Sequence, residues 1–281
     1  MHKFFRPSLM AISVVFALSS AAPALAAADD APMPNVQIEN RTSLSGFSVS
    51  TGATYWQGDF GAPTTSELFI ALVNLRYEFD GLRVWGTLPY MRVESDGVLF
   101  AGTDGGPILV DTGSPSPAGR VRNGFGDVTL GATYAVVENG GDWAVDLSSR
   151  VKLPTASDES GLSTGKTDVG VSVDISRAVQ GVVPFVSAGY TFLGDPDGYD
   201  LRNTVSASAG LSIPFGGDDT VALISYEYDR AATDFVDDGH ELFGAVSGTV
   251  SDQFSWTGFG TVGLSEGASD FALGLLLSLS F

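Results

Sequence analysis

The segment from Asp270 to Phe281 alternates apolar and small residues almost without a break. Every second residue from Phe271 onward is a leucine or a phenylalanine, and only Leu276 interrupts the intervening small and polar positions. Because alternate side chains of a strand lie on opposite faces, one face is wholly apolar and needs lipid or a core to cover it. Phe271 and Phe281 are ten residues apart, which is about 25 Å of membrane depth for a strand tilted near 40°. We therefore predict a membrane-spanning strand of a β-barrel, closed so that no edge is left unpaired.

Eleven further segments show the same period of two residues. They lie near residues 42–56, 69–79, 82–90, 128–136, 143–152, 168–175, 186–192, 205–215, 220–228, 242–250 and 254–264. This pattern predicts an all-β fold: a transmembrane antiparallel up-and-down β-barrel of 12 strands. Asp80-Gly81 is typical of a tight hairpin turn, and Pro89 predicts a bulge or a frayed end in its strand. The longest connection, 95–124, is rich in glycine and proline, and we expect it to fold into the mouth of the barrel.

The N-terminus has the pattern of a secretory signal peptide. Lys3 and Arg6 precede an apolar run that is too short to span a bilayer, and Ala24-Leu25-Ala26 is a small-x-small cleavage site. We expect a signal peptide at 1–26, a short acidic periplasmic tail at 27–40 and a barrel at 41–281. Export to the periplasm would then be followed by insertion into the outer membrane. No other segment is long and apolar enough for a helical membrane protein.

Charge and cysteine content exclude several classes of function. Without residues 1–26 the chain has 12 basic and 33 acidic residues, a net charge of −21. Nucleic-acid binding needs clustered cations and is therefore not expected. The absence of cysteine excludes thiol chemistry and cysteine-ligated metals. We expect no cofactor and no metal. A soluble β-sandwich is the alternative fold, but its strands would be shorter and would not carry aromatic residues at both ends.

The inward faces of the predicted strands are polar, and we expect function to reside there. A channel needs such groups to replace the hydration of a solute and to set selectivity. The candidate lumen residues are Arg76, Glu78, Arg83, Asp146, Arg150, Lys152, Asp168, Asp174, Arg202 and Glu227. In the alternative interpretation these charges pair across the lumen and fill it. The acidic excess favours cations or neutral solutes near the entrances.

Three other motifs have simpler explanations. The segment 160–167 looks like a phosphate-binding loop, but only three residues separate Gly161 from Gly165 where four are needed. The acidic segment 195–200 matches no EF-hand spacing and is expected to be an ordinary turn. His240, the only histidine after residue 26, has no neighbouring serine, so we expect a surface histidine rather than a hydrolase centre.

Several short motifs resemble an outer-membrane barrel family named for the meta-pathway of phenol degradation. They are Leu88-Pro89-Tyr90, 124–128, 130–134, Val151-Lys152-Leu153-Pro154-Thr155, 163–168, Gly189-Tyr190 and Leu193-Gly194. The resemblance covers about residues 40–281 and is strongest from 82 to 215. It implies a Gram-negative outer-membrane location and passage of small hydrophobic or aromatic compounds. Phe281 also resembles the terminal aromatic residue that the barrel-assembly machinery reads.

We therefore expect a passive outer-membrane channel for small solutes, with hydrophobic or aromatic compounds as candidates, and not an enzyme. Its expected partners are outer-membrane lipid and lipopolysaccharide, the barrel-assembly machinery and the solute. Two alternatives stay open. One is an outer-membrane lipid hydrolase that depends on His240, and the other is a filled structural or adhesive barrel whose loops act.

Overall fold

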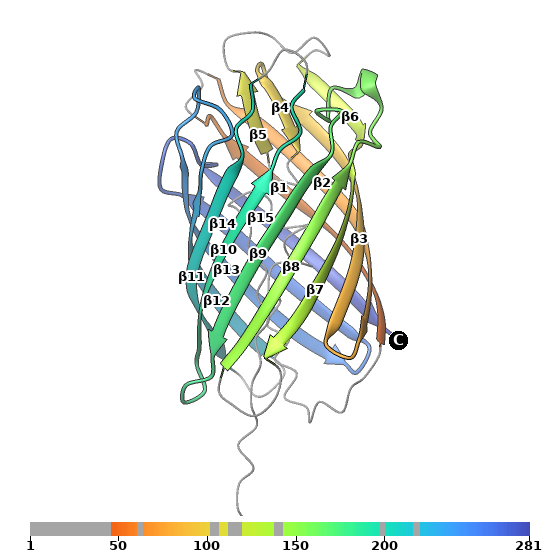
Figure 1. Cartoon of the computed structure of the whole chain (residues 1–281), viewed down its shortest axis with the longest axis vertical. Coiled ribbons are helices and arrows are strands. Elements are labelled where there is room, and N and C mark those ends of the chain that lie inside the picture. Colours follow the sequence, from red (N-terminus) through yellow and green to blue (C-terminus); the bar gives the residue numbers. More distant parts are fainter. Residues whose placement is uncertain are drawn as a thin grey trace, which may run out of the picture.

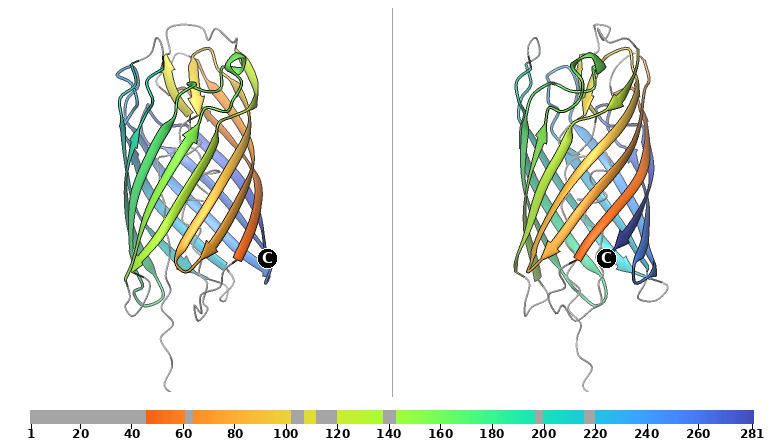
Figure 2. Two further views of the ribbon diagram at one scale, coloured as in Figure 1. Left: turned by 45° about the vertical axis from the view of Figure 1, so that its right-hand side comes forward. Right: turned by 90° about the vertical axis from the view of Figure 1, so that its right-hand side faces the viewer.

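The computed structural model describes residues 46–60, 64–101, 107–111, 120–137, 143–196, 200–215 and 220–281. Over these residues the chain forms a closed antiparallel barrel of strongly tilted strands (Figures 1 and 2). Its strands are β1(Gly46–Gly58), β2(Ser66–Phe79), β3(Leu82–Glu94), β6(Val121–Phe125), β7(Val128–Val137), β8(Trp143–Leu153), β9(Asp168–Arg177), β10(Val183–Phe192), β11(Thr204–Pro214), β12(Thr220–Asp229), β13(Gly239–Ser251), β14(Phe254–Gly263) and β15(Phe271–Ser280). The expected signal peptide and periplasmic tail lie outside the described residues.

The barrel closes between its first and last strands. Gly52 of β1 lies opposite Leu72 of β2 on one side and opposite Leu276 of β15 on the other. Both β6 and β7 pair with β3, so together they form a single barrel strand. The fold prediction is therefore confirmed: the closed antiparallel barrel has 12 strands.

The interruption between β6 and β7 lies beside Pro89. Sequence analysis expected a bulge or fray in the strand that contains this proline, but β3 continues through it and its neighbour is interrupted instead. Proline has no N–H to donate to the ladder, so the neighbouring strand leaves its register at this point. The N–H of Gly126 still donates to the Pro89 carbonyl at 2.9 Å, which holds the two sides together.

The 95–124 connection contains strands that the sequence analysis did not predict. β4(Val98–Ala101) and β5(Pro107–Asp111) form a separate hairpin, and β6 extends the barrel wall. In Figure 1 the hairpin lies at the end of the barrel opposite the C-terminus. Residues 102–106 and 112–119 lie outside the described residues. The expected role of this connection in the mouth stays a prediction.

The turn between β2 and β3 has the predicted chemistry. Asp80 and Gly81 have φ angles of 46° and 75°. Two consecutive positive φ angles define the hairpin turn whose twist matches that of the flanking strands, and Asp-Gly is a preferred pair for it. Short turns of this kind lie at the same end of the barrel as the C-terminus (Figure 2).

The outer face of the barrel is an exposed apolar surface. Its exposed side chains include Val73, Leu75, Leu130, Leu147, Val171, Val186, Leu211, Ile224, Leu242, Val262, Leu273, Leu275, Leu277 and Leu279. Such a continuous apolar surface requires a covering, and in a closed barrel lipid can supply it. Within the described residues, no helix is long and apolar enough to cross a membrane.

Aromatic residues lie at both ends of this outer face. Phe281 contacts Phe47 with ring centroids 6.1 Å apart, and Phe271 contacts Tyr55 at the same distance. These two contacts lie at opposite ends of the β1–β15 pair. Aromatic girdles at both interfaces are characteristic of membrane-spanning barrels. The spacing read from Phe271 and Phe281 thus corresponds to two aromatic ends in the structure.

Candidate functional site

The inner face carries a large apolar cluster beside the polar residues that the sequence analysis expected there. We call this the inner apolar cluster; it consists of Leu72, Val183, Phe185, Leu223, Phe243, Phe259 and Leu276, all buried. It extends along the wall from β10 to β2. Leu276, the residue that interrupts the alternation of the last strand, is one of its members. The interruption was therefore a signal of an apolar interior.

Glycines on neighbouring strands allow large inward side chains to lie flat against the wall. A Cβ atom at Gly274 would lie 2.1 Å from the Phe259 ring, and one at Gly170 would lie 2.7 Å from Nε of Arg150. Real Cβ atoms do not approach other atoms so closely, so both side chains occupy space that only glycine leaves free. The glycine content of the strands therefore shapes the interior as well as the turns.

A second apolar cluster lies toward the loop end of β1, β2 and β3. Its buried members are Trp56, Phe60, Leu68, Ile70, Met91, Val93, Leu162 and Ala272. Leu162 belongs to the 154–167 connection and is fully buried. The guanidinium of Arg122 donates to the Gly161 carbonyl at 3.0 Å. This connection therefore packs inward on the barrel, a position that the sequence analysis expected for 95–124.

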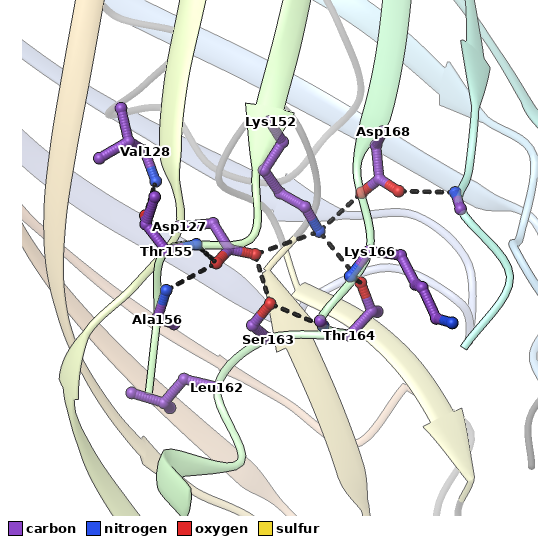
Figure 3. A network of polar contacts seen from close by, with 12 residues as sticks. Asp127, Val128, Lys152, Thr155, Ala156, Leu162, Ser163, Thr164, Lys166 and Asp168 are labelled. Carbon is purple, nitrogen blue, oxygen red and sulfur yellow. Dashed lines mark hydrogen bonds and ion pairs between the residues drawn. The ribbon is translucent and has the colours of Figure 1, made fainter. Parts of the chain in front are cut away.

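Three buried charges fix the 154–167 connection to the wall (Figure 3). Lys152 Nζ lies 2.6 Å from Oδ2 of Asp168 and 3.6 Å from Oδ2 of Asp127. The backbone N–H groups of Thr155 and Ala156 both donate to Oδ1 of Asp127 at 3.0 Å. We call Asp127, Lys152 and Asp168 the Lys152 network. Its side chains are almost completely buried, and the lysine is paired with both carboxylates.

Hydroxyl and amide groups complete the Lys152 network. The Ser163 hydroxyl donates to Oδ2 of Asp127, and the N–H of Gly194 donates to Oδ1 of Asp168 at 2.8 Å. Each of these residues belongs to one of the motifs that carry the family resemblance. These motifs, distant in sequence, meet in one structural network. Lys152 and Asp168 were candidate selectivity residues, and the structure places them in contacts that hold a connection in place.

Arg150, two residues from Lys152, has a very different environment. Its side chain faces inward on β8 and is 8 % exposed, and its Nε has no hydrogen-bond partner among the described residues. Within the described part of the chain, no carboxylate pairs with it. Arg150 lies opposite Gly131 of β7, and Gly131 lies opposite Trp85 of β3. The Nε1 of Trp85 is another buried donor without a hydrogen-bond partner among the described residues.

Glu227 and Glu241 form an acidic pair on the inner face. They are direct partners across β12 and β13, and both are buried. Glu227 accepts a hydrogen bond from Ser225 at 2.9 Å, and Oε1 of Glu241 accepts from the N–H and hydroxyl of Ser269. No cation among the described residues pairs with either carboxyl group. Sequence reasoning found Glu227 but missed Glu241, whose position opposite it depends on strand register.

The other candidate lumen residues are distributed along the wall. Asp146 and Asp174 are partners across β8 and β9, and Asp174 accepts from the Ser187 hydroxyl at 2.5 Å. Arg83 and Glu78 pair with each other at 3.5 Å on the β2–β3 hairpin. Arg76 lies near them on β2 and has an interaction of its own.

Arg202 lies outside the strands, so the structure differs here from the expected position on a strand's inner face. Its guanidinium donates to the carbonyl of Ala231 at 2.7 Å and contacts Asp234, which ties 200–203 to the connection between β12 and β13. In that connection, burial alone would raise the pKa of Asp238. Hydrogen bonds from Ala231 N–H and the Tyr228 hydroxyl, together with nearby arginine charges, outweigh burial and hold the pKa below its ordinary value.

His240 faces outward and lacks the contacts of a hydrolase. Its Nδ1 is hydrogen bonded to the Tyr226 hydroxyl at 2.5 Å, and its ring lies 5.2 Å from that of Tyr228. The backbone N–H of His240 donates to the Ser265 hydroxyl, and this hydroxyl donates to the Asp238 carbonyl instead of the imidazole. A serine nucleophile would need its hydroxyl on the imidazole, and this serine does not provide it.

The two remaining motifs show no metal or phosphate site within their described residues. Gly161 and Gly165 adopt φ angles of 63° and 66° in a connection that leads into a strand, not into a helix. Residues 197–199 of the acidic segment lie outside the described residues. In the part of the chain that is described, no group of three or more histidine or acidic residues could hold a metal ion.

Comparison with known families identifies the class to which the chain belongs. The family described as "Putative MetA-pathway of phenol degradation" matches residues 81–281. The chain is therefore a member of this family, as the motifs in the sequence indicated. No curated protein sequence matches the chain.

Several solved structures share the fold at low sequence identity. The COG4313 outer membrane channel from Pseudomonas putida F1 matches with a TM-score of 0.67 and 12 % identity, over 86 % of this chain and 99 % of that chain. The NanC porin matches with a TM-score of 0.52 and 11 % identity over 82 % and 98 % of the two chains. The KdgM porin matches with a TM-score of 0.50 and 9 % identity over 83 % and 99 %. At these identities the comparison establishes the barrel fold.

Proposed function

We propose that the protein is an outer-membrane channel for passive passage of small hydrophobic or aromatic solutes. The inner apolar cluster is the observation that carries this proposal. A purely structural barrel needs lipid-facing apolar side chains, but it does not need three phenylalanines on its inner wall. Aromatic rings on the wall can contact an aromatic solute by stacked or edge-to-face packing. The family's description and the channel and porin names of the structures that share the fold support the same proposal.

The proposed orientation follows from the lengths of the connections. The short turns and the C-terminus would face the periplasm, and the longer connections, with the Lys152 network, would face outward. Phe281 would serve as the recognition residue for the barrel-assembly machinery, and the outer apolar face would contact lipid and lipopolysaccharide. The contacts of His240 favour no enzymatic alternative.

Block of ionic current by an aromatic solute tests the proposal. We expect benzyl alcohol to reduce the current through the protein reconstituted in a planar bilayer. Phe259→Ala should weaken this block several-fold, because it removes one ring from the inner apolar cluster. Phe125→Ala, which removes an exposed ring from the outer face, is the matched control. Equal block of wild type and Phe259→Ala would contradict a role for the inner wall.

A further inference from the structure

Arg150 lies on the inner wall opposite the phenylalanines, and no carboxylate among the described residues pairs with it. The barrel order places β8 and β14 six strands apart, so Arg150 and Phe259 lie on opposite walls of a 12-strand barrel. Whether they also lie at the same height depends on register and tilt.

Following the strand partners answers this question. The row of partners from Arg150 reaches β10 at Thr191, and the row from Phe259 reaches β10 at Val183. Val183 is eight residues nearer the short-turn end than Thr191, which corresponds to about 20 Å along the barrel axis. Directly opposite residues lie on a line perpendicular to the strands. When the strands tilt near 40°, this line moves about 3 Å along the barrel axis at each strand, toward the loop end from β8 to β14, and the two lines together cross six strands. The climb therefore cancels the offset, and Arg150 and Phe259 lie at about the same height.

The two walls offer complementary contacts to one kind of molecule. A guanidinium presents a planar fork of donors that matches a carboxylate in two hydrogen bonds. The Arg150 guanidinium has no described carboxylate partner that already uses this capacity. The opposite wall presents the rings of Phe243 and Phe259, which suit the face or edge of an aromatic ring.

The acidic pair adds a preference for orientation. Glu241 is two residues from Phe243 on the same inward face of β13, and Glu227 lies opposite it on β12. An ionised carboxyl group on the phenylalanine side repels an anionic group from that wall. An aromatic acid would therefore place its ring on the phenylalanines and its carboxylate on the Arg150 side.

We propose that Arg150 and the inner apolar cluster form a binding site for aromatic carboxylates within the channel. This inference rests on the proposed channel function and narrows the class of solute. Arg150 supplies the charge-assisted hydrogen bonds, Phe243 and Phe259 supply the ring contact, and the acidic pair sets the orientation.

Current block by matched solutes tests the inference. Benzoate, benzyl alcohol and acetate are added in turn at pH 8 to the reconstituted protein, and the concentration that halves the current is measured for each. We expect Arg150→Gln to raise this concentration about tenfold for benzoate, because it removes hydrogen bonds to a charged group. Block by benzyl alcohol should stay the same. Arg92→Gln, which removes the same charge from an exposed outer position, should leave both unchanged.

Two further variants separate charge from geometry. Arg150→Lys keeps the charge but loses the planar fork, so its block by benzoate should fall between wild type and Arg150→Gln. Phe259→Ala should weaken block by benzoate and benzyl alcohol together and leave acetate unaffected. Circular dichroism confirms that each variant is folded before its current is recorded.

The outcomes distinguish this inference from the proposed function. Equal block by benzoate in wild type and Arg150→Gln overturns the aromatic-carboxylate site, and the channel still stands if benzyl alcohol blocks it. A folded wild-type protein that conducts no ions overturns the channel and the site together.

Discussion

Lys152 and Arg150 lie two residues apart on the same inward face of β8, yet their surroundings are opposite. Lys152 is paired with two carboxylates and lies within hydrogen-bond reach of Thr164. Arg150 lies against Gly170 and has no described carboxylate partner. A fully paired buried charge has no capacity left for a solute, whereas an unpaired one does. The comparison separates charges that build the barrel from charges that can bind within it.

The largest expected effect comes from breaking the Lys152 network. Lys152→Met leaves Asp127 and Asp168 buried without their cation, which costs about 3–5 kcal/mol. Arg150→Met leaves no described carboxylate unpaired and should change the free energy of unfolding by less than about 1 kcal/mol. Urea unfolding of both variants in detergent measures the difference. Equal losses would mean that Arg150 also has a structural partner.

Moving the Arg150 side chain without removing its charge should give the next largest change in stability. In Gly170→Ala the new methyl group would meet Nε of Arg150, so the arginine must shift, at a cost of about 1–3 kcal/mol. Gly244→Ala is the control, because its methyl group meets nothing closer than 3.9 Å. Thermal unfolding of the two variants should differ, and benzoate block should change only in Gly170→Ala. An unchanged block would show that the resting position of Arg150 is unimportant.

Removing one carboxyl group of the acidic pair should have a smaller effect on stability, and in the opposite direction. Like charges directly opposite each other on neighbouring strands are unfavourable by up to about 1 kcal/mol. Glu241→Gln removes one of them and should raise the unfolding midpoint slightly. Glu78→Gln, which breaks the pair with Arg83, is the control and should lower it or leave it unchanged. A clear loss of stability in Glu241→Gln would indicate that the pair binds a cation.

The smallest expected effect concerns the connection between β12 and β13. A carboxyl group whose pKa is lowered on folding stabilises the protein above its unfolded pKa, and this contribution is lost as the pH falls through the folded pKa. Asp238→Asn should therefore be slightly less stable than wild type at pH 7, and the difference should shrink as the pH falls below about 4. Thermal unfolding at several pH values measures it. A difference independent of pH would attribute the effect to hydrogen bonding alone.

The strands and the outer face of the barrel were predictable from the sequence, and many contacts of the inner face were not. Period-two alternation is a local property, so the strands, the Asp80-Gly81 turn and the aromatic ends followed from sequence. The partners of Lys152 come from separate segments that only strand register brings together. The inner apolar cluster was hidden because the outward face is also apolar, and in the last strand Leu276 was its visible sign. The unpaired state of Arg150 depends on what its neighbours contact, which no local pattern contains.

Single-channel recording of the wild-type protein tests whether the barrel is an open channel. The protein is reconstituted in a planar bilayer, and current is followed at fixed voltages in symmetrical salt. We predict stepwise ohmic currents that fall when an aromatic solute is added. A silent bilayer from folded protein would contradict it, because the barrel would then be filled and its inner phenylalanines would serve packing alone.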